Sequence, residues 1–111
     1  MNFIQTELAW AAGFFDGEGS CHISKDNKKD GRKYKYLIVS LTQNNIQPLE
    51  RFQKAVLGLG NINGPHTKGG SWTYKLAFNN FEDAQAVVGF IWKFLSPPKR
   101  NQIKQTLVDL R

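Results

Sequence analysis

Two acids stand among glycines near the amino-terminal end of this chain of 111 residues. Asp16 and Glu18 alternate with Gly17 and Gly19, directly after the mostly apolar run 8–15. A carboxylate beside glycines leaves backbone carbonyl oxygens accessible, and Mg²⁺ prefers such oxygen ligands, sharing its other positions with water and phosphate. The pattern therefore points to metal-assisted chemistry on a phosphodiester. The residues leave one alternative open, a core helix followed by two solvated acids.

The apolar run predicts a helix that begins near Thr6, as the N-cap, and ends at Gly19. Its apolar side chains occupy nearly the whole circumference, which is typical of a helix that is covered on every side. Small residues recur every four positions at Ala9, Gly13 and Gly17, a spacing that places them on one ridge where a second helix could approach closely. Glycine inside a helix lowers helix stability by roughly 1 kcal/mol relative to alanine. We therefore expect the ridge to be needed for close packing against another segment.

Residues 11–19, AAGFFDGEG, resemble the motif that names the LAGLIDADG homing endonucleases, and the chain is similar to the single-motif, homodimeric members of that family. The resemblance runs from Thr6 to about Leu110. It implies a homodimeric, site-specific DNA endonuclease that cleaves a long, nearly palindromic duplex and leaves 3′ overhangs. It also implies that Glu18 binds the metal, with the carbonyl of Gly17 as a further ligand.

Two more polar residues match what this family uses around its metals. Gln43, after a predicted strand, resembles the glutamine that positions water. Strand alternation would turn its side chain toward the core, so we expect the strand to end or bulge there. Lys99, three residues before Gln102, resembles the family's active-site lysine and could stabilise the developing negative charge or organise the attacking water. The alternatives are a polar strand end for Gln43 and a solvated cation at a helix start for Lys99.

The resemblance implies a dimer in which two copies of the first helix pack along their ridges and bring two Glu18 carboxylates to one end of the pair. Without cations these carboxylates would repel each other. Asp16 lies where the helix dipole is negative, so a neighbouring group must compensate its charge. The residues expected at the dimer interface are Ala9, Ala12, Gly13, Asp16 and Gly17.

Hydrophobic periodicity predicts the remaining elements. Alternation of apolar and polar residues predicts strands at 20–26, 34–42 and 71–78 and a short strand at 61–64. Helical spacing predicts a helix from 47, in which Pro48 takes the first helical position. It also predicts a helix from 81, capped by Asn80, and a last helix over 99–111. The expected fold is α+β, an αββαββα core with a four-stranded antiparallel, saddle-shaped sheet and helices on one face. We expect one domain, residues 1–111.

The bare face of that sheet is expected to be polar, basic and aromatic, and a lysine-rich hairpin tip would reach phosphates while the strands read bases in the major groove. The alternative for the tip is an ordinary solvated loop. The residues expected to contact DNA are Ser20, His22, Ser24, Lys25, Asp26, Lys28, Lys29, Arg32, Lys33, Tyr34, Tyr36, Ile38, Ser40, Asn61, Asn63, His66, Lys68, Thr73 and Lys75.

Composition narrows the classes of function. The formal charge of +6 favours a polyanionic partner such as double-stranded DNA. The single cysteine, Cys21, excludes an internal disulfide and a multi-cysteine zinc site. No apolar run has membrane-spanning length and no signal peptide precedes the first helix, so we expect a soluble protein in the bacterial or phage-infected cytoplasm or in an organelle matrix. The expected cofactor is Mg²⁺, with Mn²⁺ or Ca²⁺ able to replace it for binding, and no small-molecule cofactor.

Two other functions stay open on the same scaffold. One is an RNA maturase, an intron-splicing cofactor that would bind structured RNA whether or not Glu18 is intact. The other is a DNA-binding module without catalysis, which the joint presence of Glu18, Gln43 and Lys99 disfavours.

Overall fold

The computed structural model describes residues 3–27, 29–31 and 33–110. Its elements follow the predicted order, with one short 3₁₀ helix added. They are α1 (Gln5–Glu18), β1 (Gly19–Asn27), β2 (Lys33–Gln43), α2 (Ile46–Ala55), β3 (Asn61–Lys68), β4 (Ser71–Phe78), α3 (Phe81–Ile91), η1 (Trp92–Phe94) and α4 (Pro97–Leu110). The α+β class and the four-stranded antiparallel sheet are therefore confirmed.

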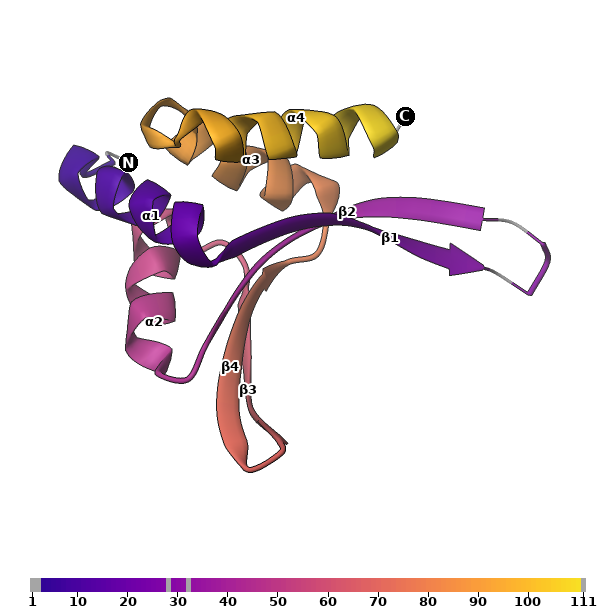
Figure 1. Ribbon diagram of the computed structural model, residues 1–111, viewed down its shortest axis with the longest axis horizontal. Coiled ribbons are helices and arrows are strands. Elements are labelled where there is room, and N and C mark those ends of the chain that lie inside the picture. The colour runs from indigo at the N-terminus through magenta and orange to yellow at the C-terminus, as the bar shows by residue number, and fades with distance from the viewer. Residues whose placement is uncertain (1–2, 28, 32, 111) are drawn as a thin grey trace.

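The strands lie in the order β1-β2-β4-β3, and every neighbouring pair is antiparallel. The helices gather on one side, while the β1–β2 arm and the β3–β4 hairpin extend beyond them and diverge, so that the sheet is strongly bent (Figure 1). The face that turns away from the helices is left uncovered. Among the described residues, no helix has the length and apolar character that a membrane span requires.

The core lies between the sheet and the helices because alternate strand residues turn the same way. Val39 on β2 and Phe78 on β4 are fully buried, and α1 contributes Leu8, Ala11, Ala12 and Phe15, which share one side of the helix. The ring of Phe52 on α2 lies 6.4 Å from that of Phe15 and 6.2 Å from that of Phe78. These aromatic contacts fix α1 and α2 against the sheet.

The predicted starts of three helices were wrong by one or two residues, and the third of these helices, α4, begins at Pro97 instead of at 99. Helix α1 begins at Gln5, and its N-cap is Ile4, whose carbonyl accepts from the N–H groups of Glu7 and Leu8; Thr6 lies inside the first turn. Helix α2 begins at Ile46 because the side chain of Asn45 accepts from Gln47 N at 2.9 Å. Pro48 is therefore the third helical residue, which is tolerated because the first-turn N–H groups need no helical partner.

Strand β3 is longer than the predicted 61–64, since it continues through the cis Gly64–Pro65 peptide bond to Lys68. Pro65 is tolerated inside β3 because β3 is an edge strand and carries a bulge between Asn63 and His66. A Cβ atom on Gly64 would lie 2.7 Å from the carbonyl oxygen of Thr73. Glycine is thus required where β3 passes β4.

Helix α2 ends in a Schellman motif. Gly58 N donates to the carbonyl of Gln53 at 2.8 Å and Leu57 N to that of Lys54 at 3.2 Å. The C′ position of this motif usually holds glycine, yet here it holds Leu57 with φ of 62°. A leucine in this left-handed conformation costs about 1–2 kcal/mol.

Candidate active site and nucleic-acid interface

Glu18 is the last residue of α1, and its side chain is exposed, as is Gly17 before it. Gly19 follows as the C-cap, its N–H donating to the carbonyl of Phe15, and β1 begins at once. A Cβ atom on Gly19 would overlap the Phe15 ring, which explains the last glycine of the motif. The final carbonyls of a helix have no partner within it, so oxygen atoms gather around Glu18.

Lys99 reaches this helix end from the other end of the chain. Its Nζ donates to the carbonyl oxygen of Gly19 at 3.1 Å, across 80 positions of sequence, and to Oε1 of Gln102 at 3.1 Å. The ammonium also lies 5.6 Å from the centre of the Phe15 ring. The fold thus places a cation on the backbone of Gly19, the residue that follows Glu18.

Asp16 has the compensating partner that its position demands. Its carboxylate accepts from Ser96 N at 3.1 Å and from Ser96 Oγ at 3.0 Å. Ser96 directly precedes α4, so the carboxylate lies at the positive end of that helix, which offsets its place in the last turn of α1. Asp16 is half-buried in these contacts within the chain, rather than lying on the ridge of small residues with which it was grouped.

Sequence reasoning missed Ser96. A serine before Pro97 and Pro98 is a recognisable helix start, since serine is a favoured N-cap and proline a favoured first residue. This local pattern predicts the start of α4, but it does not predict that Ser96 forms hydrogen bonds with Asp16.

Gln43 is the last residue of β2, one residue beyond the predicted strand, and it still pairs with Tyr74, so the strand ends at this residue rather than before it. The register pairs Gly19, the residue after α1, with Leu41, so Gln43 lies two residues further along, at the end of the inner strand β2. Its side chain is half-buried and stands opposite Tyr74. Within the described part of the chain, no hydrogen bond joins Gln43 to Glu18 or Lys99.

The ridge of small residues on α1 faces solvent. Ala9, Gly13 and Gly17 are exposed, and a Cβ atom on either glycine would meet nothing within 4 Å. Packing within the chain therefore does not require these glycines. Ala12 is different: its exposure is 0%, because it shares the buried stripe with Leu8, so its assignment to an exposed interface was wrong.

One flank of the ridge is formed by aromatic and charged side chains that sequence reasoning did not connect. The rings of Trp10 and Phe14 stack at 5.2 Å, and the guanidinium of Arg51 lies 3.9 Å from the Trp10 ring centre. Arg51 also donates two hydrogen bonds to Oε2 of Glu7, at 2.8 and 3.0 Å. These contacts hold Trp10 in place beside the ridge.

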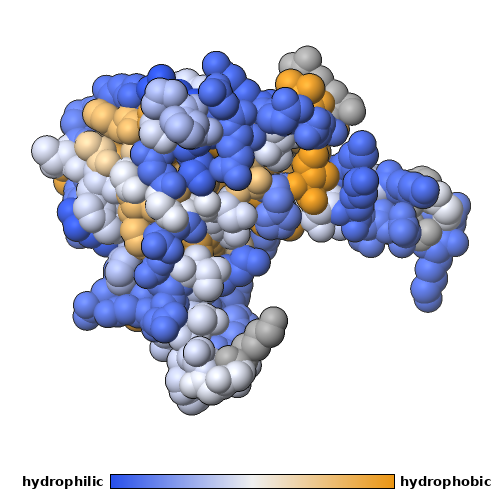
Figure 2. Space-filling view, viewed as in Figure 1, coloured by the Kyte–Doolittle hydropathy of each residue, from blue (hydrophilic) through white to orange (hydrophobic). Residues whose placement is uncertain are grey.

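The uncovered face of the sheet carries the residues expected to read bases. The register sets His22 opposite Ile38 and Ser24 opposite Tyr36, and Lys75 stands between Thr42 and Asn63. The arm that presents the first two pairs is predominantly hydrophilic on the face seen in Figure 2. The remaining members of this face are Ser20, Asp26, Tyr34, Asn61, His66 and Thr73.

Ser40 does not join that surface. It lies between Ser20 and Ala77 in the middle of the sheet, and only 4% of it is exposed. Its expected role as a DNA contact was therefore wrong, because parity gives the face of a strand residue but not its accessibility.

The β1–β2 arm concentrates positive charge. Lys25 pairs directly with Lys35, and Lys33 pairs with Asn27, while Lys29 is exposed near the tip. Like charges that face each other across two strands are destabilising unless an anion lies nearby. Of the other predicted contacts, Lys28, Arg32 and the side chain of Lys68 lie outside the described residues.

Cys21 lies on the buried side of β1, as its parity predicts. Burial raises the pKa of its thiol, and a hydrogen bond with Thr106 and the charge of Lys99 only partly oppose this effect. A buried, protonated thiol is a poor nucleophile and a poor metal ligand. The described residues also contain no group of three or more histidines, cysteines and acids that could hold a metal by themselves.

A family model described as LAGLIDADG endonuclease matches residues 11–106, which include the part of α1 from Ala11 onward, the whole sheet and Lys99. The chain belongs to the LAGLIDADG endonuclease family. An intron-encoded DNA endonuclease, ai2b, of Dictyostelium discoideum is 31% identical over 102 residues, which are 89% of this chain and 36% of that protein. The present LAGLIDADG chain therefore spans about a third of this curated relative.

Solved structures of LAGLIDADG homing endonucleases share the fold. The archaeal intron-encoded enzyme I-Vdi141I, complexed with DNA, is 25% identical with a TM-score of 0.68, over 81% of this chain and 56% of that one. The group I intron-encoded enzyme I-CeuI, also complexed with DNA, is 22% identical with a TM-score of 0.76, and the match covers 99% of this chain and 56% of that one. The homing endonuclease I-TnaI is 24% identical with a TM-score of 0.75, and the match covers 99% of this chain and 73% of that one.

Proposed function

We propose that this chain acts as a homodimeric, site-specific endonuclease on double-stranded DNA. The observation that carries the proposal is the position of Glu18, which ends an exposed ridge of small residues and directly precedes Gly19, whose carbonyl accepts a hydrogen bond from the ammonium of Lys99. The relatives named as DNA endonucleases or solved as DNA complexes support the choice of substrate.

The dimer follows from the ridge. Ala9, Gly13 and Gly17 leave the backbone of α1 open along one side, so that a second copy of α1 could approach at close distance. Two helices paired in this way would bring two Glu18 side chains to the same end, one for each DNA strand. A single chain offers only one such acid at this helix end.

The residues at this helix end fit a divalent metal with oxygen ligands. Glu18 and the carbonyl of Gly17 would hold it, and the small number of protein oxygens suits Mg²⁺, which keeps several water and phosphate ligands. One enzyme of this fold, I-CvuI, is described in complex with DNA in two structures, one in the presence of Mg and one in the presence of Ca. When bound, the metal would lower the pKa of a coordinated water and stabilise charge on the phosphate.

The other polar residues have separate roles in the hydrolysis. Lys99, fixed by Gly19 and Gln102, would stabilise the negative charge that develops on the phosphate when water attacks in line. Gln43 would orient that water from the end of β2. Asp16 would act through Ser96, by holding α4 and therefore Lys99 against the end of α1.

The uncovered sheet face would lie in the major groove of one half-site, with the lysines of the arm on the phosphate backbone. The two-fold symmetry of the dimer would demand a long, nearly palindromic target. Cleavage would fall at its centre, across the minor groove, and leave 3′ overhangs.

The decisive experiment selects cleaved molecules from a randomised duplex library in the presence of Mg²⁺. Wild-type protein is expected to yield a target with two-fold symmetry, and Glu18→Gln is expected to bind that target without cutting it. Glu50→Gln, an exposed acid on α2, serves as the matched control and should cut normally. Equal cutting by Glu18→Gln, or a target without symmetry, would overturn the proposal; splicing of an intron RNA that survives Glu18→Gln, with no DNA cleavage by wild type, would favour a maturase.

A further inference from the structure

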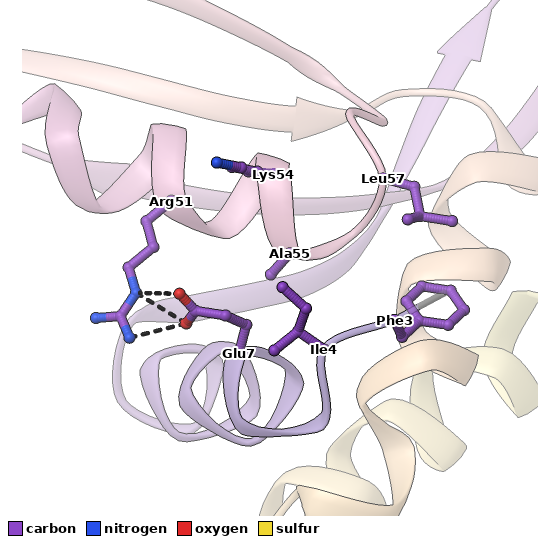
Figure 3. Close-up of a pocket in the computed structure, with 7 residues that line it drawn as sticks. All are labelled: Phe3, Ile4, Glu7, Arg51, Lys54, Ala55 and Leu57. Atoms are coloured by element: carbon purple, nitrogen blue, oxygen red, sulfur yellow. Dashed lines mark hydrogen bonds and ion pairs between the residues drawn. The ribbon is translucent and has the colours of Figure 1, made fainter. Parts of the chain in front are cut away.

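A small pocket opens at the amino-terminal end of α1, between this helix and the end of α2. Its volume is about 290 Å³, and Phe3, Ile4, Ala55 and Leu57 form its apolar walls. Figure 3 shows the ion pair of Glu7 at one end and Phe3 and Leu57 at the other. Because α1 has 14 residues, this pocket lies about 20 Å from Glu18 at the opposite end of the helix.

Leu57 is the residue in this pocket that the fold does not explain. It occupies the C′ position of the Schellman motif with φ of 62°, where glycine would be relaxed and leucine is strained. Its side chain forms part of the pocket wall and is still 38% exposed. The strained conformation thus leaves part of a large apolar side chain on the surface.

Ile4 repeats this pattern across the pocket. It lines the same pocket and is 63% exposed. Two large apolar residues thus flank one concavity from different segments, an arrangement typical of a protein-binding surface rather than of scattered exposure.

The charges at the rim favour an acidic partner. Glu7 is engaged by Arg51 in the two-hydrogen-bond contact, so their charges offset each other. Lys54 is exposed and has no carboxylate partner among the described residues. The rim therefore keeps one uncompensated positive charge beside the apolar walls.

We propose that this pocket binds a segment of a partner protein that inserts one aromatic or aliphatic side chain and places an acidic residue beside Lys54. The volume is at the small end of the range of about 300–1,000 Å³ found for ligand pockets, which suits one anchoring side chain. The ridge on α1 that the proposed dimer uses is a separate surface, because Gly13 and Gly17 do not line the pocket.

Three blocked peptides test this proposal by NMR titration of the full ¹⁵N-labelled chain. The first has the sequence Ala-Asp-Phe-Glu-Ala; the second replaces its phenylalanine by alanine, and the third replaces both acids by lysine. The first is expected to shift the amide signals of Ile4, Ala55 and Leu57 with a Kd on the order of 1 mM, and the others to bind at least about tenfold more weakly.

Leu57→Gly is the sharpest variant, because glycine relieves the strained conformation while it removes one wall of the pocket. It is expected to fold with an unchanged or higher Tm and to bind the first peptide at least about tenfold more weakly. Lys54→Gln should weaken the same peptide several-fold and more at low salt. Val108→Ala, which removes an exposed apolar side chain on α4, is the matched control and should bind as wild type.

Several outcomes would overturn the proposal. One is the absence of saturable shifts with the first peptide up to about 10 mM, and another is equal binding of all three peptides or of Leu57→Gly. A third is binding of a second copy of this chain in the pocket. The exposed Phe81 is followed by two acids and therefore has the chemistry proposed for the partner segment. Self-association that disappears in both Leu57→Gly and Phe81→Ala would assign the pocket to that interface between copies. DNA cleavage is measured in parallel and should not change in any of these variants.

Discussion

The carboxylate of Asp16 accepts hydrogen bonds from both the backbone N–H and the hydroxyl of Ser96, across 80 positions of sequence. This contact joins the carboxyl end of α1 to the amino end of α4. Since Lys99 follows Ser96 by three residues, the same contact sets where the lysine ammonium lies relative to Glu18. Stability and catalysis should therefore both depend on Asp16.

Asp16→Ala is expected to lower the free energy of unfolding by about 1–3 kcal/mol, because the half-buried N–H and hydroxyl of Ser96 lose their acceptor. Urea denaturation measures this change, and Glu50→Ala, at an exposed site, should change it by no more than about 0.5 kcal/mol. The single-turnover cleavage rate at saturating DNA should also fall, with partial recovery in Asp16→Asn, which keeps one acceptor oxygen. A wild-type cleavage rate in the destabilised Asp16→Ala would show that the contact does not position Lys99.

The open ridge on α1 predicts that substitutions of Gly13 affect the stability of the chain and its dimerisation in different ways. Gly13→Ala should stabilise the single chain by about 0.5–1 kcal/mol, since the added Cβ meets nothing, whereas Gly13→Leu should fold but fail to dimerise. Sedimentation equilibrium with and without DNA measures the loss of the dimer.

Gly89 on α3 provides a matched control for the ridge, because it is also a helical glycine whose Cβ would meet nothing within 4 Å. Gly89→Leu should fold and leave the oligomeric state unchanged. Equal dimerisation of Gly13→Leu and wild type would remove the ridge from the interface.

The facing lysines on the arm predict how DNA binding responds to salt. Lys25→Gln should weaken binding to all duplexes and reduce the slope of log K against log salt by about 0.9 for each phosphate that the variant no longer neutralises. In the free protein the same change should stabilise the arm, because it relieves the repulsion from Lys35. Fluorescence anisotropy at several salt concentrations measures the slope, and Lys93→Gln on η1 should leave it unchanged. A Lys25→Gln variant that binds one sequence more weakly and all others normally would instead indicate base recognition.

The buried thiol of Cys21 predicts a loss of stability in alkaline solution. Its pKa is raised above 9.0 in the folded chain, chiefly by burial, so the unfolded chain loses the proton first. The contribution of Cys21 is thus fully present below pH 9 and is lost as the pH rises through the folded-state pKa. Urea denaturation between neutral and alkaline pH checks this, and Cys21→Ala should show a smaller decline above pH 9 than wild type. An identical decline in both proteins would show that another group is responsible.

The sequence by itself determined the elements and the acids of the site. Alternation in β2 and β4 and the four-residue spacing on α1 depend on local geometry, so the face of each residue and the order of the elements could be derived from neighbours along the chain. The position of Glu18 beside glycines at a helix end is likewise local, and the nine-residue motif carried its interpretation.

Only the tertiary structure decided which distant groups meet and which residues are reachable. The partners Asp16 and Ser96, and Lys99 and Gly19, are each 80 positions apart, and no local pattern encodes a pairing of that kind. Accessibility depends on what neighbouring segments cover, which is why Ser40 is buried although its parity placed it on the open face of the sheet. Ala12 lies on the same stripe as Leu8, so the chain's own core covers it and a second copy cannot reach it. The same holds for Leu57, whose strained conformation and exposed side chain arise only where α2 ends against the start of α1.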